Sequence, residues 1–256
     1  MTRRCFFIET VEPDQGCVVL TGQTAHHILS VLRMGTGDAL ELRDGRGRGW
    51  KGVIVGGQKT SVRVQVNESE PLRNESPLKL TLAMAMARSD RMDQVVRQAT
   101  ELGVHRFVGY RSQRSQYGLS DARARKRCER WLRIAREAMC QCGRMIVPGI
   151  TYVPDLTEFI AAQWGAGTPG NFLRLLASEE EQNSALQDVW QSTPVCDAIL
   201  TVIGPEGGWT EGELEEFAAN GFRTVHLGPR ILRLETAAVA FVAVVQMLWG
   251  DLSSRR

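Results

Sequence analysis

Two glycine- and proline-containing segments near the C-terminus constrain the fold of this chain most. They are Ile203-Gly-Pro-Glu-Gly-Gly-Trp209 and Leu227-Gly-Pro-Arg-Ile-Leu-Arg-Leu-Glu-Thr236. Each follows a run of β-forming residues and leads into a helical pattern. Because the loop after each strand of a parallel sheet leaves its carboxyl edge, both loops are expected at that edge of an α/β sheet. Glycine lets the backbone approach a ligand and adopt positive φ, and proline stiffens the loop. The pair therefore predicts a ligand crevice, and the charged side chains in it would be Glu206, Arg230, Arg233 and Glu235.

These residues also have a simpler interpretation. Glycines serve turns more often than ligands, Glu206 would suit a helix N-terminus, and Glu235 would suit the cap of the last helix. Arg230 and Arg233 would then be ordinary surface residues. The stiffness of two neighbouring loops that together hold four charged residues favours a site over ordinary turns.

Length and composition describe a globular chain of one large or two ordinary domains: 256 residues, 43% hydrophobic and 23% charged. No apolar run is long enough to span a bilayer. The N-terminus reaches Glu9 before any usable apolar region, so a secretory signal is not expected and the location is expected to be cytoplasmic. The six cysteines and four histidines show no metal-ligand spacing, so we expect reduced thiols and no metal.

The front of the chain has the pattern of a small β domain. Short strands are predicted at residues 6–8, 18–20, 39–42, 52–55 and 61–66, separated by turn residues, as in a barrel or sandwich. A helix with Thr24 as its cap is predicted at residues 24–32, and residues 68–76 are predicted to be a linker.

Beyond the linker, strands and helices alternate, which predicts a parallel sheet covered by helices. The helix starts and stops have specific signals: Gly103 and Gly221 as terminating glycines, and Thr210 with Glu213 as a capping box. The last helix is almost wholly apolar, so we expect it to be buried on most sides or at a subunit interface. The predicted strands are 78–85, 104–110, 172–177, 198–203 and 223–227, and the predicted helices are 89–102, 121–143, 214–219 and 235–249.

The clearest charge cluster lies between residues 111 and 144, which hold ten basic residues against three acidic ones, with Tyr117 and Trp131 interleaved. Such an excess is too large for pairing along an ordinary solvated helix face, and it is typical of nucleic-acid binding. A smaller basic turn at residues 44–51 carries Arg46, Arg48 and Lys51. That turn is either an RNA contact or a mobile hairpin tip, and both interpretations stay open.

With these segments in view, the chain resembles the RsmE family of ribosomal RNA methyltransferases, which belongs to the SPOUT superfamily. The two glycine segments carry the likeness, and residues 31–38 (VLRMGTGD), 100–104 (TELGV) and 141–144 (QCGR, followed by Val147-Pro148) agree with it. The match runs in order along essentially the whole chain, and the two glycine signatures together are highly specific.

The resemblance implies an α/β, SPOUT-type domain with a parallel sheet and a deep trefoil knot at residues 76–256. A PUA-like RNA-binding β-barrel at residues 1–72 would precede it. The cofactor would be S-adenosyl-L-methionine, and the active site would form across a homodimer interface, with no metal and no membrane. The product would be N3-methyluridine in the 16S rRNA of the small ribosomal subunit.

The site residues then follow as expectations. Arg233 would stabilise negative charge on the uracil, and either Glu206 or Glu235 would accept its proton. Backbone groups of the two loops would hold the cofactor, at Ile203, Gly204, Gly207, Gly208, Leu227, Gly228, Ile231 and Leu232. Arginines of both domains would bind RNA, namely Arg3, Arg4, Arg33, Arg46, Arg48, Arg123, Arg127 and Arg144.

Three positions depart from the family pattern. Arg91 and Arg97 stand where lysine is common, which keeps the charge but changes the geometry, and Cys140 replaces a usual glutamate. Two alternatives stay open: a SPOUT methyltransferase of another RNA specificity, and a non-catalytic RNA-binding ribosome-assembly factor. A small-molecule α/β enzyme fits less well, because it would not need the basic cluster.

Overall fold

The computed structural model describes residues 4–9, 16–58, 60–115, 120–158, 160 and 171–253. The chain forms two compact units. The first unit comprises Met1–Glu75 and Arg136–Val147, and the second comprises Ser76–Ala135 and Pro148–Arg256.

The first unit is built on a five-stranded sheet with the order β1-β3-β4-β5-β2. All neighbouring strands are antiparallel except β1 and β3, which are parallel. In β5 the side chains of Val62, Val64 and Val66 alternate into the core, as the period of a strand requires. The predicted β-rich front is thus confirmed. Its strands are β1 (Cys5–Phe7), β2 (Cys17–Thr21), β3 (Ala39–Arg43), β4 (Gly49–Gln58) and β5 (Ser61–Glu70).

Two local predictions in this unit were wrong. Thr24 does not cap a helix, because α1 (Gly22–His26) already begins at Gly22, whose positive φ of 61° lets the chain turn directly out of β2. The helix continues as a π-helical turn, η1 (His27–Val31). β5 runs on to Glu70, so the first residues of the predicted linker belong to a strand.

The second unit holds a six-stranded parallel sheet with the order β11-β9-β10-β6-β7-β8. The predicted alternation is therefore confirmed, but the sequence pattern did not reveal β8 or α5. The strands are β6 (Lys79–Ala85), β7 (Arg106–Tyr110), β8 (Gly149–Val153), β9 (Phe172–Ala177), β10 (Ala198–Ile203) and β11 (Arg223–Val225). The helices are α2 (Ser89–Glu101), α3 (Asp121–Cys142), α5 (Leu186–Ser192), α6 (Glu211–Ala219) and α7 (Leu234–Leu248). The residues of α3 from Arg136 on belong to the first unit.

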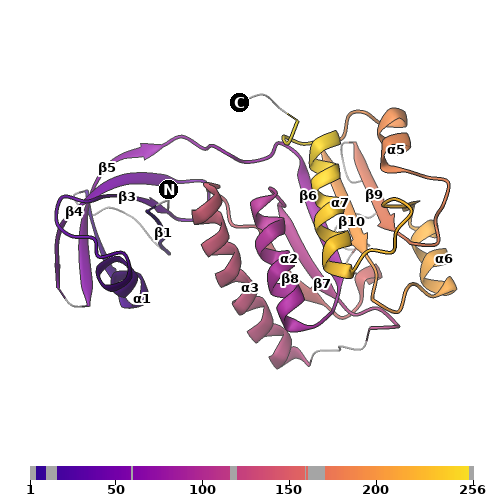
Figure 1. Ribbon diagram of the computed structural model, residues 1–256, viewed down its shortest axis with the longest axis horizontal. Coiled ribbons are helices and arrows are strands. Elements are labelled where there is room, and N and C mark those ends of the chain that lie inside the picture. Colours follow the sequence, from indigo (N-terminus) through magenta and orange to yellow (C-terminus); the bar gives the residue numbers. More distant parts are fainter. Residues whose placement is uncertain are drawn as a thin grey trace. The chain divides into compact units, whose positions relative to one another are not determined.

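The two faces of this sheet are covered by different elements. One face, with Ala83, Val108 and Leu200, packs against Phe217 of α6 and the aromatic residues beside it. On the other face α7 packs against β6, β10 and α2 (Figure 1). The strand order does not by itself trace the path of a knot, so the trefoil knot stays a prediction.

The predicted helix ends in this unit are confirmed. Gly103 and Gly221 have φ values of 83° and 75°, as terminating glycines require. Thr210 and Glu213 form the capping box at the start of α6. Gly103 and Gly221 thus fix where α2 and α6 stop, shortly before β7 and β11 begin, and the capping box fixes where the loop after β10 ends and α6 starts.

Candidate functional site

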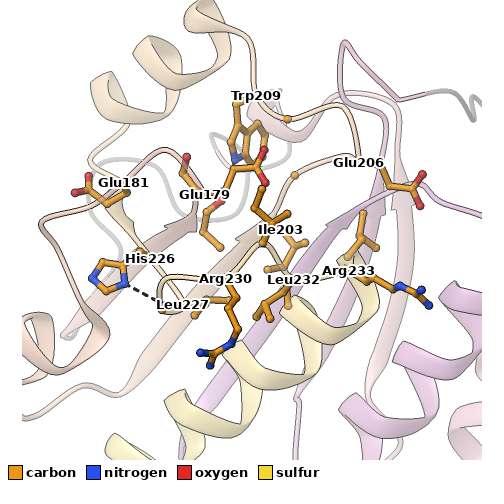
Figure 2. A pocket seen from close by; sticks show the side chains of 18 of the residues that line it. Glu179, Glu181, Ile203, Glu206, Trp209, His226, Leu227, Arg230, Leu232 and Arg233 are labelled. Atoms are coloured by element: carbon orange, nitrogen blue, oxygen red, sulfur yellow. Dashed lines mark hydrogen bonds between the residues drawn. The ribbon is translucent and has the colours of Figure 1, made fainter.

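Three adjacent strands end in register at the edge of the sheet where both glycine segments lie. Ile203 at the end of β10 pairs with Ala177 at the end of β9, and Ala177 also pairs with Val225 at the end of β11. The three following loops therefore leave the sheet side by side. Between them lies a pocket of about 910 Å³ (Figure 2).

The first glycine loop, residues 204–210, wraps around the indole of Trp209. A Cβ at Gly204 would lie 2.6 Å from that ring, so only glycine fits. The indole Nε1 donates to the carbonyl of Ala177 at 2.9 Å, which ties this loop to the end of β9. At the base of the loop, the buried hydroxyl of Tyr110 donates to the carbonyl of Ile203 at 2.9 Å. These contacts hold the loop backbone against the pocket.

The second glycine loop, residues 226–233, takes a sharp turn at Gly228, whose φ is 95°. The backbone N–H of Gly228 donates to Nδ1 of His226 at 3.1 Å, so the imidazole braces the turn. No heavy atom outside its immediate neighbours lies within 4 Å of a Cβ built at Gly228, which leaves this backbone open to a ligand. The side chain of Ile231 is 83% exposed.

A third wall of the pocket follows β9 and was missed by sequence reasoning. It is formed by Ser178, Glu179, Glu181 and Gln182. In Figure 2, Glu179 and Glu181 lie to one side of the pocket with His226, whereas Glu206 and Arg233 lie to the other. The strand at residues 172–177 was predicted, but the sequence does not show that the loop after it lies beside the two glycine loops.

The structure brings almost all the predicted pocket residues together. Of the eight backbone candidates, seven line the pocket, and Gly207 is the exception. Glu206 and Arg233 line it as well, but Glu235 does not. The seven are Ile203, Gly204, Gly208, Leu227, Gly228, Ile231 and Leu232.

Arg91 joins the two candidate acids, which come from different elements. Its Nη1 pairs with Glu206 of the first glycine loop, and its Nε lies 3.8 Å from Oε2 of Glu235 at the start of α7. Arg91 also lines the pocket. The side chains of Arg91, Glu206 and Glu235 are 28%, 45% and 15% exposed. These three side chains therefore lie at an edge of the pocket that solvent partly reaches.

The arginines expected to bind RNA have different surroundings in the first unit. Arg33 is exposed with a φ of 52°, which is unusual for a residue with a side chain, and Arg46 is exposed. Arg4 and Arg48 are exposed but paired, with Asp38 and Asp44 at 2.8 and 2.7 Å. Arg3 lies outside the described residues.

Arg144 does not fit the prediction of an RNA contact. It is only 4% exposed, and it forms a buried ion pair with Glu75 at 2.8 Å. The other oxygen of Glu75 accepts hydrogen bonds from the backbone N–H groups of Met145 and Ile146. Arg144 therefore has a structural role, because a buried guanidinium needs such a partner. Cys140 is also buried, beside Cys5, so it is not a surface contact either.

In the second unit, Arg123 is exposed on α3. Arg127 is half-buried because its guanidinium donates to the hydroxyl of Ser89 at the start of α2. Arg130 pairs with Asp93 at 2.6 Å. One positive charge of α3 is therefore neutralised by an acid, whereas that of Arg123 stays exposed. Tyr117, which the sequence places in the same cluster, lies outside the described residues.

Over the residues with described positions, no group of three or more His, Cys, Asp or Glu side chains is placed to hold a metal ion. No helix in that same part of the chain is both long and apolar enough to cross a membrane.

Comparisons with known proteins identify the family of this chain. A family model described as an RNA methyltransferase domain matches residues 74–246, and one described as an RNA methyltransferase PUA domain matches residues 20–67. The Ribosomal RNA small subunit methyltransferase E of Bacillus subtilis is 32% identical over 241 residues, which cover 91% of this chain and 92% of that protein.

Two solved structures are similar along almost the whole chain. The Ribosomal RNA small subunit methyltransferase E of Neisseria gonorrhoeae, bound to S-adenosyl methionine, has a TM-score of 0.85 and 31% identity, covering 98% of this chain and 99% of that one. A Legionella pneumophila structure in complex with the cofactor SAM has a TM-score of 0.87 and 28% identity, covering 98% and 100%. The chain belongs to the ribosomal RNA small subunit methyltransferase E family, an RNA methyltransferase domain preceded by a PUA domain.

Proposed function

We propose that this protein uses S-adenosyl-L-methionine to methylate N3 of a uridine in the 16S rRNA of the small ribosomal subunit. The observation that carries the proposal is the pocket, which both glycine loops build together and whose edge holds Arg233 and Glu206. Family membership supplies the substrate class, because the curated relatives are named for the small-subunit ribosomal RNA. With such a substrate, we also propose that the protein acts in the cytoplasm.

The residues present fit this cofactor. The pocket volume of about 910 Å³ is within the range of small-molecule sites. The open backbone at Gly228 and the left-handed turn at Gly208 expose peptide groups that can bind polar parts of a nucleoside. Glu179 and Glu181 suit a ligand that carries positive charge. We assign the backbones of the seven pocket-lining residues to cofactor binding, with Gly207 behind them.

When bound, the cofactor supplies a methyl group that is already activated by its sulfonium charge. The protein's part is to align the base and manage its N3 proton. Alignment of two reactants is worth on the order of 7–11 kcal/mol in well-oriented cases. Arg233 stabilises the negative charge that develops on the uracil as N3 loses its proton.

Glu206 is the stronger candidate to accept that proton, because it lines the pocket and its side chain is 45% exposed. Glu235 does not line the pocket, and it faces Arg91, which does. We therefore assign Glu235 to orienting Arg91. Five exposed arginines that the resemblance singles out bind the surrounding RNA backbone, namely Arg4, Arg33, Arg46, Arg48 and Arg123.

A homodimer is part of the proposal. The last helix exposes apolar side chains, with Val244 and Met247 38% and 60% exposed, and Leu252 just beyond it is 52% exposed. A single chain leaves these side chains in water, and a second copy would cover them. Light scattering on the purified protein tests this, and a monomer mass at micromolar concentration would contradict it.

The decisive experiment is mass spectrometry of nucleosides. Small subunits from a strain without this enzyme are incubated with the protein and S-adenosylmethionine, and their rRNA is digested. We expect one new N3-methyluridine per 16S rRNA. A different methylated nucleoside would mean another RNA specificity. Cofactor binding without methylation of any ribosomal RNA, or no cofactor binding at all, would favour a non-catalytic assembly factor.

A further inference from the structure

The carboxylate of Glu213 accepts hydrogen bonds on two sides. Glu213 lies in the first turn of α6 and is only 7% exposed. Its Oε2 accepts from the backbone N–H of Thr210 at 2.9 Å, and the N–H of Glu213 donates to the hydroxyl of Thr210 at 3.2 Å; this reciprocal pair is the local capping box. Its Oε1 accepts from the hydroxyl of Ser112 at 2.7 Å and the backbone N–H of Gln113 at 2.9 Å. Helix capping does not require this second pair, which reaches a loop about a hundred residues away in sequence.

The segment held by Oε1 is a compact turn after β7. The backbone N–H of Ser115 donates to the carbonyl of Ser112 at 3.0 Å, and the hydroxyl of Ser115 accepts from the N–H of Ser112 at 3.1 Å. Fixing this turn fixes Arg114 within it. We call residues Ser112–Ser115 the serine turn.

Arg114 of the serine turn supports the first glycine loop from outside the pocket. Its Nη1 donates to the carbonyl of Gly207 at 3.1 Å. A Cβ at Gly207 would lie 3.3 Å from the Cβ of Arg114, so the two backbones are closely packed. The next residue, Gly208, lines the pocket itself. A buried carboxylate, a turn and an arginine thus connect α6 to the wall of the pocket.

We propose that Glu213 is a positioning residue of the cofactor site, which acts through the serine turn and Arg114. Glu213 holds the turn, and Arg114 holds the Gly207–Gly208 backbone in the shape that receives the ligand. A loop ordered before binding loses less conformational freedom when the ligand arrives, so affinity is higher. This inference rests on the cofactor site proposed above.

Glu213→Gln is the first test, with Glu216→Gln, an exposed acid on the same helix, as the matched control. An amide must turn its NH₂ toward the donors on one of the two sides, which leaves those donors unsatisfied. We expect E213Q to bind S-adenosylmethionine about tenfold more weakly in calorimetry, since an unsatisfied buried donor is costly, and E216Q to bind like the wild type. Hydrogen exchange should become faster in residues 111–115 and 204–209 together. A role in capping alone predicts faster exchange confined to the start of α6 and unchanged affinity, and this result would overturn the inference.

Arg114→Ala tests the same link if E213Q does not fold, because Arg114 is exposed. Lys79→Ala, exposed at the amino end of β6, is its control. We expect R114A to weaken cofactor binding while its thermal midpoint stays at the wild-type value. If the wild type binds cofactor and both variants bind equally well, the positioning role is wrong. If the wild type binds no S-adenosylmethionine, the proposed function fails. Hydrogen exchange in residues 204–209 of the variants still shows whether the serine turn orders the first glycine loop.

Discussion

Arg91 of α2 forms an ion pair with Glu206 of the first glycine loop. The same guanidinium faces Glu235 at the start of α7, with 3.8 Å between Nε and the carboxylate. One arginine thus orients both acids that the sequence singles out, at the edge of the pocket. The planar fork of arginine suits this arrangement, because separate nitrogens face separate carboxylates.

Replacing Arg91 tests whether this fork matters. Lysine keeps the charge but offers a single ammonium, so we expect R91K to lower kcat/KM for RNA methylation by about tenfold and R91A to lower it further. This loss corresponds to about 1.5 kcal/mol of transition-state stabilisation, the lower end of the range for hydrogen bonds to charged groups. We choose the lower end because the ion pair between Arg91 and Glu206 is partly exposed. Steady-state kinetics with R88A as the control measures this, because Arg88 is exposed and is not part of the pocket. Equal kinetics for R91A and R88A would contradict the role.

The catalytic assignment of Arg233 makes a different prediction. R233A should lower the methylation rate by about 10²–10³, as loss of one oxyanion-stabilising donor does in other enzymes. Cofactor affinity should change little, because the backbone rather than this side chain is assigned to the cofactor. Single-turnover kinetics and calorimetry separate the two quantities. If both the rate and the affinity stay at the wild-type level, Arg233 does not act in catalysis.

A pair of glycine substitutions tests the shape of the first loop. Gly204→Ala places a Cβ 2.6 Å from the ring of Trp209, whereas Gly212→Ala in α6 meets nothing within 4 Å. We expect G204A to displace Trp209, to destabilise the protein by about 1–3 kcal/mol and to weaken cofactor binding. G212A should be neutral or slightly stabilising, because alanine favours a helix. Denaturation curves and tryptophan fluorescence report both changes, and similar behaviour of the two variants would refute the packing argument.

Binding of RNA should depend steeply on salt. Each arginine or lysine that neutralises a phosphate contributes roughly one unit to the slope of log K against log salt concentration. We expect R123A to reduce that slope by about one, because Arg123 is exposed. R144A should instead lower stability, because it would leave the buried Glu75 unpaired. Filter binding between 50 and about 200 mM salt provides the measurement, and a flat salt profile would contradict an electrostatic interface.

Acid should weaken the contribution of Glu213 to stability. Burial alone would raise the pKa of Glu213, but hydrogen bonds from Thr210, Gln113 and Ser112 together outweigh burial and hold this pKa below its usual value of 4.5. A carboxyl with a lower pKa in the folded state stabilises the fold above its unfolded pKa and loses that effect as pH falls through the folded value. Tyr110, which faces Glu213, has a pKa well above 10.0, so it stays protonated throughout this range.

The stability difference between wild type and E213Q should therefore be full at neutral pH and shrink as the pH falls below about 4.5. Urea unfolding at a series of pH values measures it. A difference that stays constant into strong acid would mean that the carboxylate charge of Glu213 has no part in stability.

The sequence predicted best what depends on local signals. Gly103, Gly221 and the Thr210–Glu213 capping box fixed three helix ends, because each acts within one turn of its own helix. Both glycine loops were identified for the same reason. A capping box also has a visible pattern in the sequence, but the second pair of hydrogen bonds made by Glu213 has none, because its partners lie in the serine turn.

What the sequence missed depends on distant contacts. Arg91 was noted only as a departure from a family pattern, since nothing in its neighbourhood places it between Glu206 and Glu235. The wall at Ser178–Gln182 follows a strand that was predicted, but the strand order that sets it beside β10 and β11 was not deducible. Arg144 was counted as part of a charged surface, because a count of charges does not distinguish a buried ion pair from a solvated side chain.

The central strands of the parallel sheet lie far apart in the chain, with Lys79 of β6 paired to Ala198 of β10. Such non-local pairing requires loop closure before the contact can stabilise the chain, so we expect the middle of this sheet to form late in folding. During synthesis β6 emerges early and remains without this neighbour until nearly the whole chain has been made. A nascent chain therefore has no pocket, and cofactor binding reports that folding has been completed.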